Sequence, residues 1–358
     1  MGSSLHIGLI GPLPPPSGGM ANQTLQLAKL LRQEDIQVEV VQTNAKYKPK
    51  WAGKVPVIRA LFRLVYYAIN LWAVSGRVDL FHIMANSGWS WHLFTVPAVW
   101  IAKLRGVPTV INYRGGEAEK FFSKSFKYVK PTLNASSSIV VPSRFLEDVF
   151  SERGVTTQII ANIIDLDRFS LIENKSKPYS PHLLVTRNLE LIYDNETAIR
   201  AFNEILVAHP NAQLTIAGTG PELENLQSLV VQLELSKRVT FTGRIDTQQM
   251  PALYQSADVM LNPSRVDNMP NSILEALASG VPVVSTNVGG IPYMVEHEST
   301  ALLVGPEDYK AMATAIRQVL EDKQCQQNLV NSGLALVQQF AWSEVSQHWL
   351  SLYKKLAV

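Results

Sequence analysis

Residues 262–290 read NPSRVDNMPNSILEALASGVPVVSTNVGG. An apolar strand end is followed by a loop with Asp267, a helical segment entered at Pro270 with Glu275 inside it, and a second apolar strand. Strand, helix and strand in this order are typical of a βαβ unit in a parallel sheet. The stretch therefore predicts an open α/β sheet with two carboxylates at the carboxyl edge, where such sheets bind ligands.

The same alternation extends along the whole chain. Short runs rich in Val and Ile are separated by segments long enough for crossover helices. The predicted strands are Leu5–Ile10, Val38–Gln42, Leu80–Ile83, Thr109–Asn112, Ser138–Val141, Gln158–Ala161, His182–Thr186, Gln213–Ala217, Val239–Thr242, Val259–Asn262, Pro282–Ser285 and Ala301–Val304. They form two sets of six. At roughly 100 to 200 residues per domain, the 358 residues accommodate two doubly wound domains.

The boundary between these domains is predicted from a change in composition. Residues 165–181 are polar and contain two prolines, as expected of an exposed connection. We therefore predict a first domain at 1–164, a second at 182–340, and a final helix at 341–358 that packs back toward the first. The active site is expected in the cleft between the two domains.

Charge is distributed unevenly along the chain. Residues 1–164 contain 18 Lys and Arg against 9 Asp and Glu, and the remainder contains 14 against 21, so the halves carry about +9 and −7. A basic half is typical of a protein that faces nucleic acid, lipid headgroups or a phosphorylated substrate. Nucleic acid is disfavoured because no recognisable binding module accompanies the basic stretch. The single cysteine, Cys325, excludes an internal disulfide, and the N-terminus lacks a basic signal-peptide region, so a cytoplasmic protein is expected.

Two glycine pairs follow predicted strands. Gly18-Gly19 precedes a helical pattern from Met20 to about Arg32, so its backbone N–H groups could approach an anion at a helix N-terminus. The alternative is a tight turn without a ligand. Gly218-x-Gly220 lacks the third glycine of the dinucleotide fingerprint, because position 223 is Leu.

The helix entered at Pro270 combines two kinds of recognition. Its first N–H groups and positive dipole end favour a phosphate, while flanking carboxylates can accept hydrogen bonds from sugar hydroxyls. The candidate ligand-binding residues at this helix start are Asn268, Met269, Asn271 and Ser272. An alternative is structural: Ser272 and Glu275 also fit a capping box, in which the glutamate bonds the N–H of the cap residue.

These motifs resemble family 4 of the retaining glycosyltransferases, also called glycosyl transferases group 1, of the bacterial surface-polysaccharide type. The family signature is Glu-x7-Glu, then Val-Pro-Val-Val and a Gly-Gly turn; this chain has Asp267-x7-Glu275, Val281-Pro282-Val283-Val284 and Gly289-Gly290. Further similar stretches are Ala217–Leu226, Arg238–Ile245, Tyr254–Ser264 and Asn162–Phe169. The resemblance covers most of the second half and, in the first half, mainly the glycine loop and one strand.

The resemblance implies a GT-B fold with two Rossmann-like domains, and a hexosyltransferase that retains anomeric configuration without a metal or cofactor. It implies that Glu275 binds the ribose hydroxyls, Asp267 the hexose and Arg187 the diphosphate of a UDP- or GDP-linked donor. The backbone at Arg244 and Ile245 would face the base. From the first domain, Gly18 and Gly19 would approach the diphosphate, and in the second domain Gly218 and Gly220 would contact the donor. The acceptor is expected to be a lipid-linked saccharide or an oligosaccharide.

The chain departs from the family pattern at four places. The first acid is Asp267, a family lysine is replaced by Tyr193, a family histidine by Arg114, and the usual Asn-Gly turn by Asn162-Ile163. We hypothesise that Arg114 restores the missing cation, since a guanidinium suits oxyanion contacts. Two alternatives to transfer remain: an epimerase or phosphorylase on this fold, and a non-catalytic partner subunit that binds sugar nucleotides.

Metal binding is not predicted. Asp165-x-Asp167 resembles the metal motif of another glycosyltransferase fold, but it lies in the predicted connection, and the histidines show no paired spacing. His82 ends a strand, so it could line the cleft, as could Tyr193. A satisfied core histidine is an equally good interpretation of His82.

Residues 46–77 predict contact with an anionic membrane surface. The interval between Glu39 and Asp79 contains no acid and seven bases: Lys46, Lys48, Lys50, Lys54, Arg59, Arg63 and Arg77. The apolar segment after the lysines carries Tyr66, Tyr67 and Trp72, as an interfacial helix does. The alternative is a Rossmann helix buried against its sheet with a solvated arginine edge. We expect a peripheral location on the inner face of the cytoplasmic membrane, without a membrane span.

Overall fold

The computed structural model describes residues 5–15, 18–45, 56–171 and 180–357, and within these the side chains of residues 56–61 are left undescribed. Contacts divide the chain into two units, Met1–Ala161 with Val345–Val358, and Asn162–Glu344. The lysines at 46, 48, 50 and 54, and residues 172–179 of the predicted connection, lie outside the described residues.

The first unit contains a six-stranded parallel sheet in the order β2-β1-β3-β4-β5-β6. Its strands are β1 (His6–Gly11), β2 (Gln37–Gln42), β3 (Leu80–Ala85), β4 (Thr109–Tyr113), β5 (Ser138–Val141) and β6 (Gln158–Ile159). Its helices are α1 (Gly19–Gln33), α2 (Pro56–Ser75), α3 (Val96–Leu104) after the π-helical turn η2 (Trp91–Thr95), α4 (Ala118–Ala135), α5 (Arg144–Ser151) and α12 (Trp342–Leu356).

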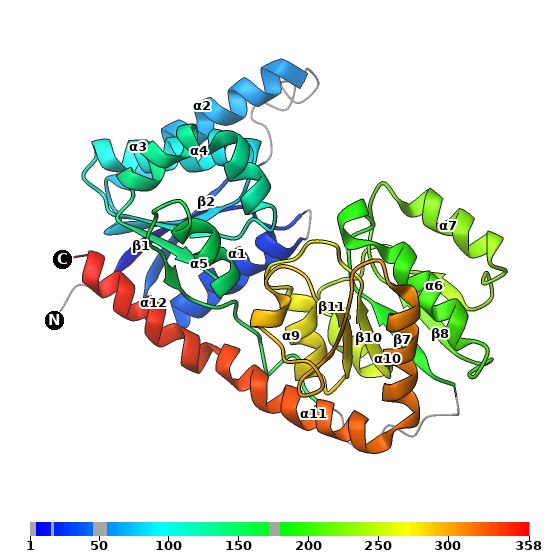
Figure 1. Ribbon diagram of the computed structural model, residues 1–358. Coiled ribbons are helices and arrows are strands. Elements are labelled where there is room, and N and C mark those ends of the chain that lie inside the picture. The colour runs from blue at the N-terminus through cyan, green and yellow to red at the C-terminus, as the bar shows by residue number, and fades with distance from the viewer. Residues whose placement is uncertain (1–4, 16–17, 46–55, 172–179, 358) are drawn as a thin grey trace. The chain divides into compact units, whose positions relative to one another are not determined.

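The helices of the first unit cover both faces of its sheet. Helix α1 connects β1 to the edge strand β2, whereas α2, α3, α4 and α5 connect strands in the opposite direction across the sheet. Because such crossovers are right-handed, α1 lies on one face of the sheet and the other four helices lie on the opposite face. Along that second face α2 contacts α3, α3 contacts α4, and α4 contacts α5, with α2, α3 and α4 side by side in Figure 1. The strand β3 is buried along its whole length, which explains its continuous apolar sequence.

The second unit contains a parallel sheet in the order β12-β11-β10-β7-β8-β9. Its strands are β7 (His182–Val185), β8 (Gln213–Ile216), β9 (Val239–Phe241), β10 (Val259–Asn262), β11 (Val283–Thr286) and β12 (Leu302–Val304). Its helices are η3 (Leu191–Tyr193), α6 (Asn195–Ile205), α7 (Leu223–Gln232), α8 (Met250–Ser256), α9 (Asn271–Ala278), η4 (Ile291–Tyr293), α10 (Tyr309–Glu321), α11 (Lys323–Val337) and η5 (Gln338–Phe340).

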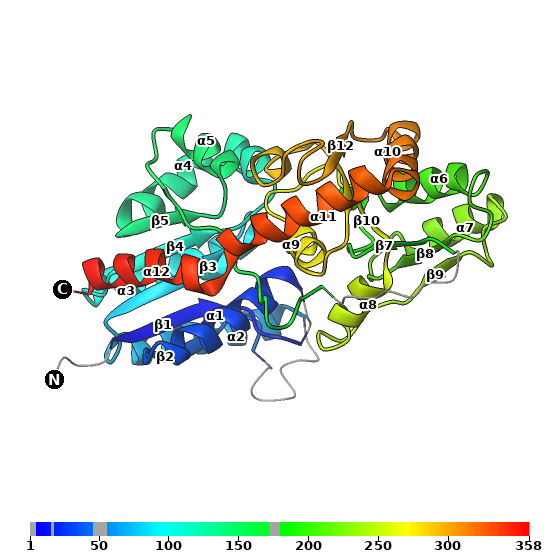
Figure 2. The same cartoon turned by 90° about the horizontal axis from the view of Figure 1, so that it is seen from below.

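The predicted α/β class is confirmed by two six-stranded parallel sheets. In the second sheet the chain order reverses between β7 and β10, which pair with each other in parallel register. Figure 2 shows these two strands together at the centre of the second unit. Loops that follow the two strands therefore meet at the topological switch point, where open α/β sheets bind ligands.

Candidate functional site

An arginine and an aspartate meet at the switch point of the second unit. Arg187 follows β7 and Asp267 follows β10, so the adjacent ends of these strands bring together residues 80 positions apart. The Arg187 Nη2 and Asp267 Oδ2 atoms are 2.5 Å apart, and the side chains are 12% and 11% exposed. The residues expected to bind the diphosphate and the hexose therefore form a shielded ion pair.

The guanidinium of Arg187 is held on a second side by an aromatic ring. Its central carbon lies 4.1 Å from the centre of the Tyr193 ring, and Nη1 donates a hydrogen bond to Ser272 Oγ at 3.4 Å. The buried Nε atom has no hydrogen-bond partner in the described part of the chain. Tyr193 thus supplies no second cation here, but its ring lies against the guanidinium of Arg187.

The loop that carries Asp267 is fixed by its own hydrogen bonds and by the Gly-Gly turn. The carboxylate accepts from Ser264 Oγ at 3.2 Å and from the backbone N–H of Asn268 at 3.0 Å. A Cβ atom on Gly289 or Gly290 would lie 2.0 Å from the carbonyl oxygen of Asp267 or Asn268, respectively. The turn therefore requires glycine because the acidic loop packs directly on its backbone.

Glu275 lies inside α9 and bonds a buried tyrosine. Its Oε2 atom accepts a hydrogen bond from the Tyr254 hydroxyl at 2.9 Å, and that hydroxyl lies 2.8 Å from Thr186 Oγ1. The capping-box alternative is wrong, because the N-cap residue is Pro270, which has no N–H to offer a glutamate. Pro270 therefore precedes the first helical turn rather than lying within it.

Burial raises the pKa of Glu275 to about 7, although the Tyr254 hydrogen bond and the charges of Arg168 and Arg187 lower it. The ordinary value of 4.5 applies to the unfolded chain. Because the folded pKa is the higher one, this group favours the folded state most below pH 4.5, and its contribution is lost as the pH rises through 7.

We expect the free energy of unfolding to fall between pH 5 and pH 8 by roughly 2 kcal/mol more in the wild type than in Glu275→Gln, which cannot titrate. Urea denaturation at the two pH values measures this difference. Equal pH dependence in the two proteins would contradict the raised pKa.

The start of α9 is held by the segment that leaves the first unit's last strand. Asn162 Nδ2 donates to the Met269 carbonyl oxygen and to Asn271 Oδ1, both at 2.8 Å. Asn268 and Met269 are buried, so a ligand would meet their main chain rather than their side chains. The N-cap makes no side-chain hydrogen bond, which leaves the positive dipole end of α9 beside Arg187 and Ser272.

The glycines of the second unit that were predicted to contact the donor also have a packing role. A Cβ atom on Gly218 would lie 2.1 Å from the Arg187 carbonyl oxygen, and one on Gly220 would lie 2.2 Å from that of Leu189. They therefore allow the loop after β8 to support the arginine loop. Beyond β9, Arg244 is exposed and Ile245 is half-buried.

The two first-unit glycines that were expected to approach the diphosphate are exposed. Gly18 is the N-cap of α1 and Gly19 is its first residue, and a Cβ atom on either would have no neighbour within 4 Å among the described atoms. Packing within the unit therefore gives no reason for glycine at these two positions.

His82 is fully buried in the first unit, so its cleft-lining interpretation is wrong and the core interpretation holds. Asn112 accepts from Arg114 Nε at 3.1 Å through its oxygen and offers its amide nitrogen to His82 Nε2 at 2.9 Å. The ring proton therefore lies on Nδ1, 2.6 Å from the Tyr353 hydroxyl of α12. Burial, with a smaller effect of Arg114, lowers the pKa of His82 to about 3, so the ring is neutral.

Arg114 belongs to the same buried network. In addition to Asn112, it donates through Nη1 to Gln23 Oε1 of α1 at 2.6 Å, and burial lowers its pKa to about 10. The guanidinium remains a cation at neutral pH. Its proposed action on a diphosphate stays a prediction.

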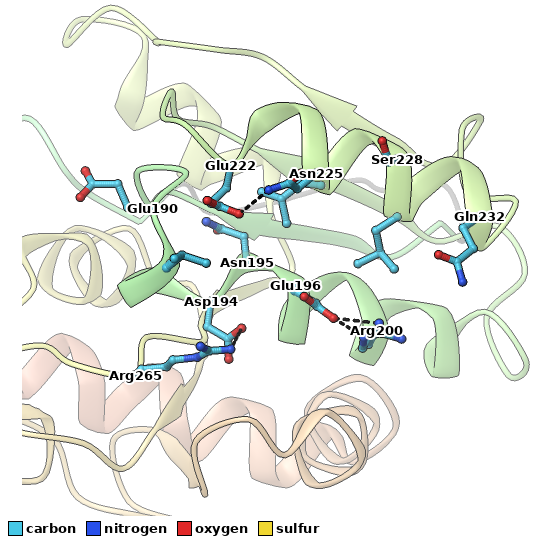
Figure 3. Close-up of a pocket in the computed structure, with 13 residues that line it drawn as sticks. Glu190, Asp194, Asn195, Glu196, Arg200, Glu222, Asn225, Ser228, Gln232 and Arg265 are labelled. Atoms are coloured by element: carbon cyan, nitrogen blue, oxygen red, sulfur yellow. Dashed lines mark hydrogen bonds and ion pairs between the residues drawn. The ribbon is translucent and has the colours of Figure 1, made fainter.

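A separate pocket of about 290 Å³ lies between α6 and α7 (Figure 3). None of the residues predicted from the sequence lines it. Six of its polar side chains bond one another in pairs: Glu196 with Arg200 at 2.8 Å, Asp194 with Arg265 at 3.1 Å, and Glu222 with Asn225 at 2.9 Å. Because these side chains already bond one another, the pocket is a weaker candidate for a ligand site than the cluster of Arg187, Asp267 and Glu275 at the switch point.

Tyr254, Thr186 and Ser264 are the members of the site that the sequence did not single out. Tyr254 and Ser264 are the first and last residues of one stretch that resembles the family. Thr186 precedes Arg187 at the end of a predicted strand. For Thr186 and Ser264 the available signal was their position just after a strand end. Tyr254 lies inside α8, where there was no such signal. Within the described ranges, no three His, Cys, Asp or Glu residues are grouped closely enough to hold a metal ion.

Comparison with known families matches the two halves of the chain separately. The family described as Glycosyl transferases group 1 matches residues 169–334, and Glycosyltransferase Family 4 matches residues 17–168. An uncharacterized glycosyltransferase of Methanocaldococcus jannaschii is 34% identical over 160 residues, which are 44% of this chain and 41% of that protein.

Two further proteins add to this comparison. A GDP-mannose-dependent alpha-(1-6)-phosphatidylinositol monomannoside mannosyltransferase of Mycobacterium tuberculosis is 34% identical over 169 residues, 45% of this chain and 42% of its own. The chain thus spans about two fifths of the length of each of these curated relatives. Anabaena HepE, solved in complex with UDP and glucose, has a TM-score of 0.77 at 18% identity, covering 97% of this chain and 99% of HepE.

The two family matches together account for residues 17–334, and the two doubly wound sheets agree with the GT-B fold of the solved neighbours. The chain belongs to the group 1 glycosyltransferase family.

Proposed function

We propose that the protein transfers a sugar, with retention, from a nucleotide-sugar donor to a lipid-linked saccharide acceptor. The observation that carries this proposal is the cluster of Arg187, Asp267 and Glu275 at the switch point, beside the uncapped start of α9. A cation and a helix dipole suit a diphosphate, and two acids suit sugar hydroxyls.

In this proposal the donor replaces contacts that the free protein makes internally. The diphosphate takes the guanidinium of Arg187 from Asp267, whose carboxylate is then free to accept a hydrogen bond from the hexose. Glu275 accepts from the ribose hydroxyls. As the glycosidic bond breaks, negative charge grows on the leaving diphosphate, and the arginine and the α9 dipole stabilise it without a metal or cofactor.

The acceptor and the location of the protein are inferred from charge and from relatives. The M. tuberculosis relative is named for an acceptor that is itself a lipid, and the first 164 residues of this chain carry a net charge of about +9. A phosphorylated lipid-linked saccharide and an anionic membrane surface suit such a charge. None of the helices in the described ranges has the length and apolar character to cross a membrane.

A thermal-shift screen against UDP- and GDP-linked sugars tests the proposed donor class. A donor at 100 times its Kd should stabilise the protein by about 2.7 kcal/mol, a shift of roughly 5 °C or more for a domain of this size. UDP and GDP without sugar are the matched controls. The absence of any shift across the panel would contradict donor binding.

Analysis of the reaction products then distinguishes sugar transfer from the epimerase and phosphorylase alternatives. Release of nucleoside diphosphate only when acceptor is added indicates transfer. Release without acceptor, or a change in the sugar's configuration, would indicate the epimerase or phosphorylase alternative.

A further inference from the structure

Helix α2 is apolar on two opposite faces. Tyr67, Leu71 and Val74 are at most 3% exposed and pack in the core of the first unit. The opposite face carries large apolar side chains at helical spacing, each 38–62% exposed: Phe62, Val65, Tyr66, Ile69 and Trp72. A helix that covers a sheet normally turns polar residues outward, so burial against the sheet does not explain this outer face.

The apolar surface continues onto α3. Helix α3 contacts α2 and exposes Trp100 to 39% and Leu104 to 76%. Two cations lie over the indole rings of this surface: Arg105 is 4.9 Å from the centre of the Trp72 ring, and Lys103 is 5.2 Å from that of Trp100. Helices that lie in a membrane interface combine Lys and Arg with Trp and Leu, as this surface does.

Helix α4 adds a row of lysines. Trp100 of α3 donates to Thr132 Oγ1 of α4 at 3.2 Å, so the two helices are directly joined. Lys120, Lys124 and Lys127 are exposed and spaced four and three residues apart, which places them on one side of α4. Lys120 also pairs with Glu117, just before the helix, at 2.9 Å. With Lys130 and a single acid, Glu119, this helix has a net charge of +3.

We propose that the outer faces of α2, α3 and α4 form one docking surface for an anionic lipid bilayer. This deepens the membrane part of the proposed function. The apolar side chains of α2 and α3 enter the boundary between headgroups and acyl chains, and the α4 lysines bind anionic headgroups. Figure 1 shows the three helices on the same side of the first unit.

The charge of this surface favours a bilayer over a second copy of the chain. A second copy of the chain would present the same lysine row, so self-association through this face would bring like charges together. Arg77, one of the bases predicted for the membrane, instead pairs with Glu39 at 2.5 Å. In the described part of the chain, the bases beside the apolar face include Lys103 of α3, Arg105 just after it, and the α4 lysines.

Vesicle flotation at low salt tests the surface on the full-length chain. Vesicles of phosphatidylcholine with phosphatidylglycerol should bind the wild type, and phosphatidylcholine vesicles should bind it at least tenfold less. Ile69→Ser with Trp72→Ser, and separately Lys124→Gln with Lys127→Gln, should each lower partition onto the anionic vesicles about tenfold or more. Matched controls in the second unit are Val207→Ser with Val231→Ser, and Lys237→Gln with Lys310→Gln, all at exposed positions.

The outcomes separate this surface from the proposed donor site. The thermal shifts caused by nucleotide sugars should be unchanged in all four double variants, because none of the changed residues lies at the proposed donor site. A failure to bind the donor would therefore not contradict the proposed membrane surface. Equal binding to both vesicle types, equal losses in the control variants, or a concentration-dependent dimer abolished by the α2 variant in place of vesicle binding would each overturn the proposal.

Discussion

Replacing Glu275 by glutamine is expected to lower kcat/KM for sugar transfer about a hundredfold. A carboxylate that accepts hydrogen bonds from two sugar hydroxyls contributes roughly 1.5 to 3 kcal/mol for each bond, and a neutral amide loses most of this. The fold should survive, because the glutamine oxygen can still accept from Tyr254 at the position that Glu275 Oε2 occupies. Turnover is measured as nucleoside diphosphate released in the presence of acceptor.

The control for this variant is Glu224→Gln on the exposed side of α7, which should leave turnover and melting temperature unchanged. Glu275→Gln should melt within a few degrees of the wild type at pH 6, where the native carboxyl is mostly protonated. Wild-type turnover by Glu275→Gln would show that the glutamate serves only to bond Tyr254.

Most of the fold could be predicted because parallel strands are buried on both faces. Their continuous apolar runs are visible without knowing their neighbours, and each of the twelve predicted strands overlaps an observed one. Only the strand ends differ, by one or two residues: β3 continues to Ala85 instead of Ile83, and β11 begins at Val283 instead of Pro282. Proline has no N–H for the ladder, which explains the later start of β11.

The candidate site could be predicted as a set of residues but not as a set of contacts. The pairing of Arg187 with Asp267 depends on β7 lying beside β10, an order that local sequence does not specify. Ser272 and Glu275 have the spacing of a capping box, but the helix begins two residues earlier than that motif requires, at Asn271. The burial of His82 depends on Tyr353 of α12, 271 residues away.

The prediction for Arg187 separates a structural role from a binding role. Arg187→Ala leaves the 11%-exposed Asp267 carboxylate without its cation, so the free energy of unfolding should fall by about 3 kcal/mol. Arg200→Ala is the matched control: its pair with Glu196 is exposed, and its loss should cost less than about 1 kcal/mol. Affinity for the nucleoside diphosphate should fall about a hundredfold in Arg187→Ala because a charge-assisted contact is lost.

Adding Asp267→Asn to Arg187→Ala distinguishes the two effects. The double variant no longer buries an unpaired charge, so it should recover most of the lost stability. It should not recover affinity for the diphosphate, because no cation has been restored. Arg187→Lys should bind with intermediate affinity, since an ammonium keeps the charge but cannot contact Asp267 and Ser272 while stacking its plane on Tyr193. If the double variant binds the diphosphate as tightly as the wild type, Arg187 holds the acidic loop and does not bind the donor.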